Sequence, residues 1–187
     1  MSMVPEMIVR RRLTLDDYLA LPDDQDYEII DGVLYVAPRP TSHHQLISAR
    51  LTTLLVVNVE DRDLGTVIPD ADLIVDERNT YFSPDIMVFL GDRFAKVDRN
   101  TFIRIIPDLI VEVLSPSTTR RDQIVKRRTY ASLSVPHYWI VDPSDRTIVE
   151  HTLQPNGEYQ ERRIGADEQF QPSGVTGLVI DVGRLFR

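Results

Sequence analysis

The chain has 187 residues, of which 42% are hydrophobic and 27% charged, and its formal net charge is −8. This length and composition predict one globular domain with a sizeable core. The lack of cysteine excludes disulfides and thiolate metal sites, and the negative charge argues against broad non-specific binding to nucleic acid. No apolar run approaches the roughly 18 residues of a membrane helix and no signal peptide is recognisable, so we expect a cytoplasmic protein.

The N-terminal part of the chain predicts two helices with a hairpin between them. Thr14 and Asp17 have the spacing of a capping box at the start of a short helix. Residues 27–36 predict a hairpin, because an Asp-Gly pair at its centre supplies the positive φ of a tight turn. A longer helix begins at Ser42 and carries apolar residues at helical spacing.

The rest of the chain predicts mostly strands. Residues 91–106 are expected to form a loop with one helical turn, and a helix capped by Ser117 or Thr118 should run to about Ser134. The expected strands cover two or three segments within 66–90 and then 107–114, 138–141, 147–153, 158–164 and 175–180. This order predicts an α/β domain over residues 13–187, with a mixed central sheet flanked by helices, preceded by an N-terminal arm at 1–12.

Glu112 lies in an otherwise apolar run, Leu109 to Leu114, which predicts a strand buried on both faces. An ionised carboxylate loses its hydration there, which costs several kcal/mol unless it is paired or bound to a metal. A surface edge strand could also carry this acid, but the apolar residues on both sides favour a functional role.

Three further candidates lie on the elements around this strand. Asp85 follows Pro84 at the start of another expected strand, although a turn aspartate explains the Ser-Pro-Asp triplet better when it is taken alone. Asp122, Lys126 and Tyr130 are spaced four residues apart and share one face of the following helix. For Asp122 and Lys126 alone, an exposed ion pair is the simpler interpretation.

Asp85, Glu112 and Lys126 together indicate metal-assisted hydrolysis. Two carboxylates can hold Mg²⁺, which keeps several waters and contacts phosphate. The metal activates a bound water, and a lysine can orient that water or stabilise negative charge on the phosphate. No glycine-rich nucleotide loop or Gly-x-Ser-x-Gly elbow offers a different chemistry.

Glu28 and the two adjacent histidines are weaker candidates. Alternation places Glu28 on one face of its strand with Ile30, from which it could approach the site. His43 and His44 point in different directions on a helix, so they make a poor chelate and fit a polar cap better.

Several segments of the chain resemble the putative restriction endonuclease family of bacterial proteins, within the PD-(D/E)XK nuclease superfamily. The resemblance runs from about Leu13 to the C-terminus. The segments that carry it are Tyr27 to Gly32, the helix with His43, Ser83-Pro84-Asp85, Pro107 to Thr118, Asp122-x3-Lys126-x3-Tyr130 and Val135 to Pro143.

The resemblance implies a nuclease-like α/β core and a divalent-metal site. Asp85 would be the acid of the Pro-Asp motif and Glu112 the second acid. The superfamily pattern places a lysine two residues after the second acid, where this chain has Leu114. Lys126 on the following helix is therefore the candidate lysine.

We therefore expect a DNA endonuclease that depends on Mg²⁺ or Mn²⁺ and forms a homodimer. Asp85 and Glu112 would bind the metal and Lys126 would assist catalysis, while the substrate or supporting roles fall to Glu28, His43, Asp122 and Tyr130. A non-catalytic binding module with the same fold is an alternative that the acidic charge and Leu114 favour. A metal-dependent hydrolase of a small phosphodiester also suits the net charge of −8.

Overall fold

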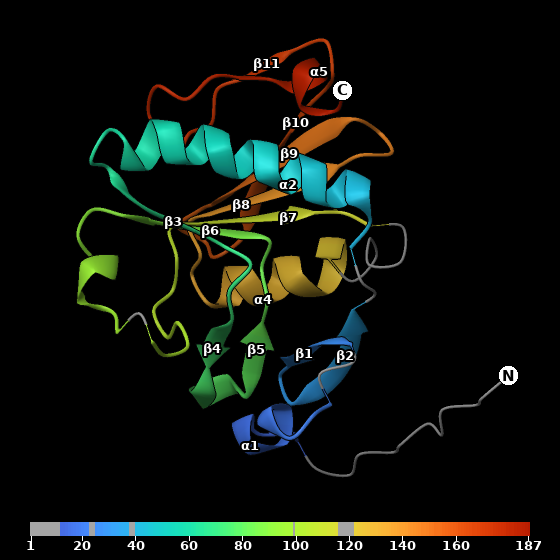
Figure 1. Ribbon diagram of the computed structural model, residues 1–187, viewed down its shortest axis with the longest axis vertical. Coiled ribbons are helices and arrows are strands. Elements are labelled where there is room, and N and C mark those ends of the chain that lie inside the picture. The colour runs from blue at the N-terminus through green and yellow to red at the C-terminus, as the bar shows by residue number, and fades with distance from the viewer. Residues whose placement is uncertain (1–11, 23–24, 38–39, 99, 116–121) are drawn as a thin grey trace, which may run out of the picture.

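The computed structural model describes residues 12–22, 25–37, 40–98, 100–115 and 122–187. Within these ranges the chain forms a six-stranded sheet, a four-stranded sheet and a two-stranded one, with helices packed around them (Figure 1). No helix in the described ranges is long and apolar enough to cross a membrane.

The six-stranded sheet is mixed, as the sequence predicts. Its strand order is β10-β9-β8-β7-β6-β3, and β7 and β8 are its one parallel pair. The strands are β3 (Gly65–Pro69), β6 (Ile86–Leu90), β7 (Leu109–Val113), β8 (His137–Asp142), β9 (Thr147–Leu153) and β10 (Tyr159–Ile164). Every residue of β7 is buried, because this central strand is covered on both faces.

Helices cover the two faces of this sheet (Figure 1). On one face lie α2 (Ser42–Leu55), its π-helical continuation η1 (Val56–Glu60) and the C-terminal α5 (Val182–Leu185). On the other face lies a helical segment formed by η4 (Asp122–Lys126) and α4 (Arg127–Ser132). The expected caps of that helix, Ser117 and Thr118, lie outside the described residues.

The four-stranded sheet packs against the far side of α4 (Figure 1). Its order is β2-β1-β5-β4, with β1 (Asp26–Ile30), β2 (Val33–Ala37), β4 (Leu73–Val75) and β5 (Thr80–Phe82). The Asp31-Gly32 turn has positive φ at both residues, which confirms the hairpin. Thr14 and Asp17 form the predicted capping box of α1 (Leu15–Leu19). Because α4 lies between the two sheets, residues from both can meet at this helix.

Two predictions for strands are wrong. Residues 66–90 contain parts of four strands rather than two or three. The expected strand at 175–180 is mostly irregular, and only β12 (Ile180–Asp181) pairs with a short β11 (Gln169–Phe170). Val175 and Leu178 are apolar because they are buried in the same core cluster as the apolar residues of α2, and not because they belong to a strand.

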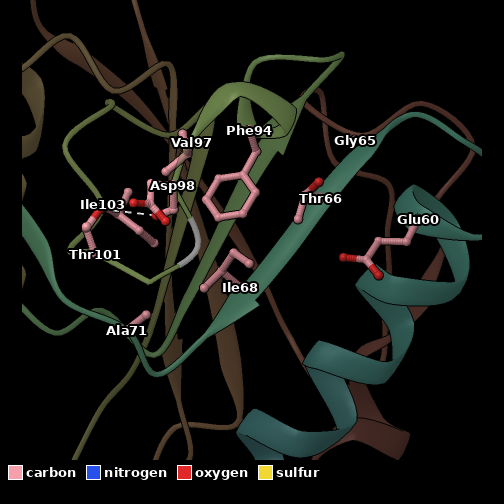
Figure 2. Close-up of a pocket in the computed structure, with 10 residues that line it drawn as sticks. All are labelled: Glu60, Gly65, Thr66, Ile68, Ala71, Phe94, Val97, Asp98, Thr101 and Ile103. Atoms are coloured by element: carbon pink, nitrogen blue, oxygen red, sulfur yellow. Dashed lines mark hydrogen bonds between the residues drawn. The ribbon is translucent and has the colours of Figure 1, made fainter.

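Two residues limit the free backbone N–H groups along the outer edge of β3. Glu60 reaches from η1 toward this strand (Figure 2), and its Oε1 accepts a hydrogen bond from the Val67 N–H at 2.7 Å. Pro69, two residues further along, has no N–H to offer. Both features reduce the tendency of an edge strand to pair with another chain.

Gly65 of β3 leaves no room for a side chain against β6. A Cβ at this position would lie 2.1 Å from the Phe89 carbonyl oxygen. Gly65→Ala should therefore lower the free energy of unfolding by about 1–3 kcal/mol in urea titrations. Gly165→Ala is the control, since its Cβ would meet one flexible carboxylate at 3.3 Å. Equal stability of the two variants would contradict the close approach.

Candidate active site

Asp85 directly precedes β6, and Glu112 lies on the neighbouring strand of the six-stranded sheet, β7. Ile86 pairs with Val111 in the antiparallel β6–β7 ladder, so extending that register by one residue sets Asp85 opposite Glu112. The Asp85 Oδ2 atom accepts a hydrogen bond from the Val113 N–H at 2.6 Å. The Pro-Asp turn before β6 thus holds the first acid against the backbone next to the second.

Lys126 lies between two buried carboxylates. Its Nζ is 2.8 Å from Glu112 Oε1 and 2.9 Å from Glu28 Oε1. The Tyr130 hydroxyl also donates a hydrogen bond to Glu112 Oε1, at 2.7 Å. All four side chains belong to residues that are at most 4% exposed. We call Glu28, Glu112, Lys126 and Tyr130 the buried ionic cluster.

The helix delivers Lys126 to this position because of its place between the two sheets. Lys126 and Tyr130 are four residues apart, so both point from the same face of the helical segment toward Glu112. Leu114 is 4% exposed and packs in the apolar cluster beneath α4, so the residue at the usual lysine position serves the core instead.

Among the side chains that the structure describes, carboxylates gather around the single ammonium of Lys126. Within the buried ionic cluster, one ammonium faces two carboxylates, and Asp85 adds a third carboxylate nearby. His44 Nε2 lies 3.2 Å from Asp85 Oδ1 and is the cationic or polar partner on that side. Buried charges require close compensation, and Lys126 gives it to both Glu28 and Glu112.

The carboxylates of Asp85 and Glu112 fit a Mg²⁺ or Mn²⁺ ion that keeps several of its waters. They do not fit an ion whose ligands all come from the protein. Among the residues that the structure describes, no group of three His, Asp or Glu side chains is arranged to hold a metal. Mg²⁺ usually retains several waters and binds through one or two carboxylates. Asp85 and Glu112 are hard oxygen donors of the required kind and number.

Tyr130 is held as a neutral hydrogen-bond donor. Burial raises its pKa well above the usual value of 10.0, and the charges of Glu112 and Glu28 raise it further. Its ring packs against Phe82 of the small sheet at 4.9 Å and against Tyr138 of β8 at 5.0 Å between centroids. The phenol is therefore fixed in place and keeps its proton at neutral pH.

The structure brings four of the seven candidates from the sequence into contact, and the β6–β7 register sets a fifth, Asp85, opposite one of them. The four are Glu112, Lys126, Glu28 and Tyr130. His43 is exposed, and the neighbouring His44 contacts Asp85 in its place. Asp122 begins η4, but its side chain lies outside the described residues.

His44 is the contact that the sequence interpretation missed. The buried residues of α2 include His44, Ile47, Leu51 and Leu55, which recur at three- and four-residue spacing. His44 therefore continues the buried stripe toward the start of the helix, while Thr41 provides the cap by accepting from the His44 N–H. The spacing of the apolar residues along this helix therefore predicts that His44 is buried and that His43 is not.

The fold and the paired acids define a restriction-endonuclease-like protein. A crystal structure described as a putative nuclease from Anabaena variabilis is similar over 93% of this chain and 97% of its own, with a TM-score of 0.77 and 22% identity. The sequence model of the Uma2 family, described as "Putative restriction endonuclease", matches residues 15–183. The chain belongs to the Uma2 family.

Two proteins of Synechocystis are similar in sequence. The uncharacterized protein slr1290 is 32% identical over 179 residues, which cover 94% of this chain and 92% of that protein. The uncharacterized protein sll1609 is 27% identical over 133 residues, covering 70% and 75%. Both relatives are described as uncharacterized, so their similarity does not indicate an activity for this chain.

Removing the ammonium from the buried ionic cluster should destabilise the fold. Lys126→Met leaves two buried carboxylates facing each other, so we expect a loss of about 3–5 kcal/mol in unfolding free energy at neutral pH. Adding Glu28→Gln should recover part of this loss, because one of the two charges is then absent. Arg128→Met, an exposed change on the same helix, should cost less than about 0.5 kcal/mol. Equal losses at residues 126 and 128 would contradict the pairing.

Tyr130 should make stability fall at alkaline pH. Its pKa is raised in the folded protein, so its contribution is complete below the unfolded value near 10 and is lost as pH rises beyond it. In Tyr130→Phe, the unfolding free energy should therefore decline less steeply above pH 10 than in the wild type. Urea titrations across this range measure the slope, and identical slopes would contradict the raised pKa.

Proposed function

We propose that the protein is an endonuclease that hydrolyses phosphodiester bonds in DNA and depends on Mg²⁺ or Mn²⁺. The observation that carries this proposal is the buried ionic cluster next to Asp85, in which an ammonium touches the second acid of the Pro-Asp pattern. A purely structural ion pair of this kind would contribute little stability after its desolvation.

Asp85 and Glu112 would hold the metal ion. When bound, the metal supplies an activated water and neutralises charge on the phosphate. Both carboxylates have fixed partners that support this role, since the Val113 N–H and His44 contact Asp85 and the Tyr130 hydroxyl contacts Glu112. Such outer contacts orient ligating groups and raise their effectiveness.

Lys126 supplies the positive charge of the mechanism. Its ammonium contacts Glu112, from which it can orient the attacking water or stabilise negative charge on a phosphate oxygen. Glu28 is a positioning residue, because its carboxylate holds the ammonium from the other side at 2.9 Å. A fixed donor needs no reorganisation as charge develops, and this lowers the barrier.

A homodimer is part of the proposal. Two copies would present two such sites to the two strands of a duplex. Because the net charge of −8 opposes broad attraction to DNA phosphates, a hydrolase of a small phosphodiester is the second candidate function.

Plasmid cleavage tests the proposal. With Mg²⁺ or Mn²⁺, the wild type should nick or linearise supercoiled DNA, and Asp85→Asn, Glu112→Gln and Lys126→Met should each lose about 100-fold or more in rate. Asp167→Asn, which removes an exposed acid near the C-terminus, should retain the wild-type rate.

Equal cleavage by all the variants would contradict the assigned site. Hydrolysis of bis(p-nitrophenyl) phosphate without cleavage of DNA would favour the small-substrate function. No hydrolysis of either substrate by a folded wild type would favour the non-catalytic binding module.

A further inference from the structure

A small hollow lies beside the active site on the same face of the six-stranded sheet. Its volume is about 280 Å³. Gln123 and Arg127 of the helical segment border it on one side, and Ile140 of β8 and Val149 of β9 border it on the other. A second hollow of about 530 Å³ lies beside β3 (Figure 2), and none of the site's acids lines it.

The sheet register fixes how the smaller hollow lies relative to the acids. Glu112 pairs with Ile140, Ile140 with Val149, and Val149 with Arg163, so these residues form one row across four strands. Neighbouring strands are about 4.8 Å apart, which places Val149 roughly 10 Å from Glu112 along the row. A short stretch of substrate strand can span that distance.

The helical segment formed by η4 and α4 contacts both the acids and the smaller hollow. Lys126 and Tyr130 point to Glu112, whereas Gln123 and Arg127, also four residues apart, border the hollow. The spacing gives each pair its own face of the helix. Any ligand in the hollow would therefore contact the helix that carries the proposed catalytic lysine.

The lining of the hollow combines an apolar floor with balanced charge. Ile140 and Val149 are buried members of the core beneath α4. Arg127 and Arg163 supply two positive charges, and Asp142 and Glu161 supply two negative ones. This balance gives little preference for a bare phosphate and offers both donors and acceptors to a neutral ligand.

His151 adds a buried imidazole whose Nε2 lies 3.6 Å from Glu161 Oε2. It is 2% exposed and lines the hollow, and its Nδ1 has no hydrogen-bond partner among the described residues. Burial lowers its pKa, and the charge of Arg127 lowers it further, so the imidazole is neutral at neutral pH. Its ring stacks on Tyr138 at 5.4 Å between centroids, which holds it in place.

We propose that this hollow binds one unstacked nucleobase of the substrate strand, a short distance from the bond that is cleaved. The inference rests on the proposed nuclease function. A base offers an apolar face and a polar edge with donors and acceptors, and proteins read such extruded bases in small pockets. The volume lies below the range for drug-sized ligands and suits a single base. Base contacts also supply affinity that an acidic protein lacks toward phosphates.

Paired oligonucleotides test the inference. One probe is a fluorescein-labelled single-stranded DNA of eight mixed nucleotides, and the other has the same phosphates but abasic residues throughout. Binding is measured by fluorescence anisotropy with Ca²⁺ in place of Mg²⁺, and gels verify that the probes stay intact. The wild type should bind the base-containing probe roughly tenfold more tightly than the abasic one.

Two variants and a matched control connect that preference to the hollow. Arg127→Met and Gln123→Ala should each bring the affinity ratio close to one. Arg128→Met removes the same charge from the adjacent, exposed residue and should keep the roughly tenfold ratio. Thermal unfolding of each variant verifies that it is folded.

The outcomes separate this inference from the proposed function. Equal affinity of the wild type for both probes would overturn the nucleobase site even if plasmid is cleaved. An unchanged ratio in both hollow variants, or equal weakening for both probes, would do the same. Failure to bind either probe together with failure to cleave plasmid would overturn the proposed function as well.

Discussion

The ammonium of Lys126 is the interaction on which the arrangement of the site depends. It is buried, so it must stay in contact with negative charge, and it finds Glu28 on the small sheet and Glu112 on the large one. The two sheets and the helix between them are thereby tied at one point. Glu112 in turn lies beside Asp85 through the β6–β7 register. The two ion pairs offset the desolvation of the Lys126 ammonium, and they hold β1, β7 and the helical segment together.

Much of this site could be predicted from local sequence. The apolar run around Glu112 predicts a fully buried strand, and all of β7 is buried. A buried acid needs a cation, and Lys126 is the lysine of the helix that follows. The structure places its amine 2.8 Å from that acid. The Asp-Gly hairpin was equally predictable, because few sequences other than Asp-Gly or Asn-Gly tolerate two positive φ angles in succession.

Contacts between distant segments could not be predicted in the same way. Glu28 and Lys126 meet because the small sheet packs under α4, and no local pattern specifies that packing. The row from Glu112 to Arg163 depends on the register of three strand pairs. Segment 175–180 misled the interpretation because burial of apolar side chains does not require a strand.

The central claim is that Asp85 and Glu112 hold a divalent cation beside Lys126. Electron paramagnetic resonance of free Mn²⁺ during titration of the folded protein measures this directly. The wild type should bind Mn²⁺ in one site, Asp85→Asn should weaken that binding by about tenfold or more, and Asp167→Asn should leave it unchanged. Equal Mn²⁺ affinity in the wild type and Asp85→Asn would contradict the account.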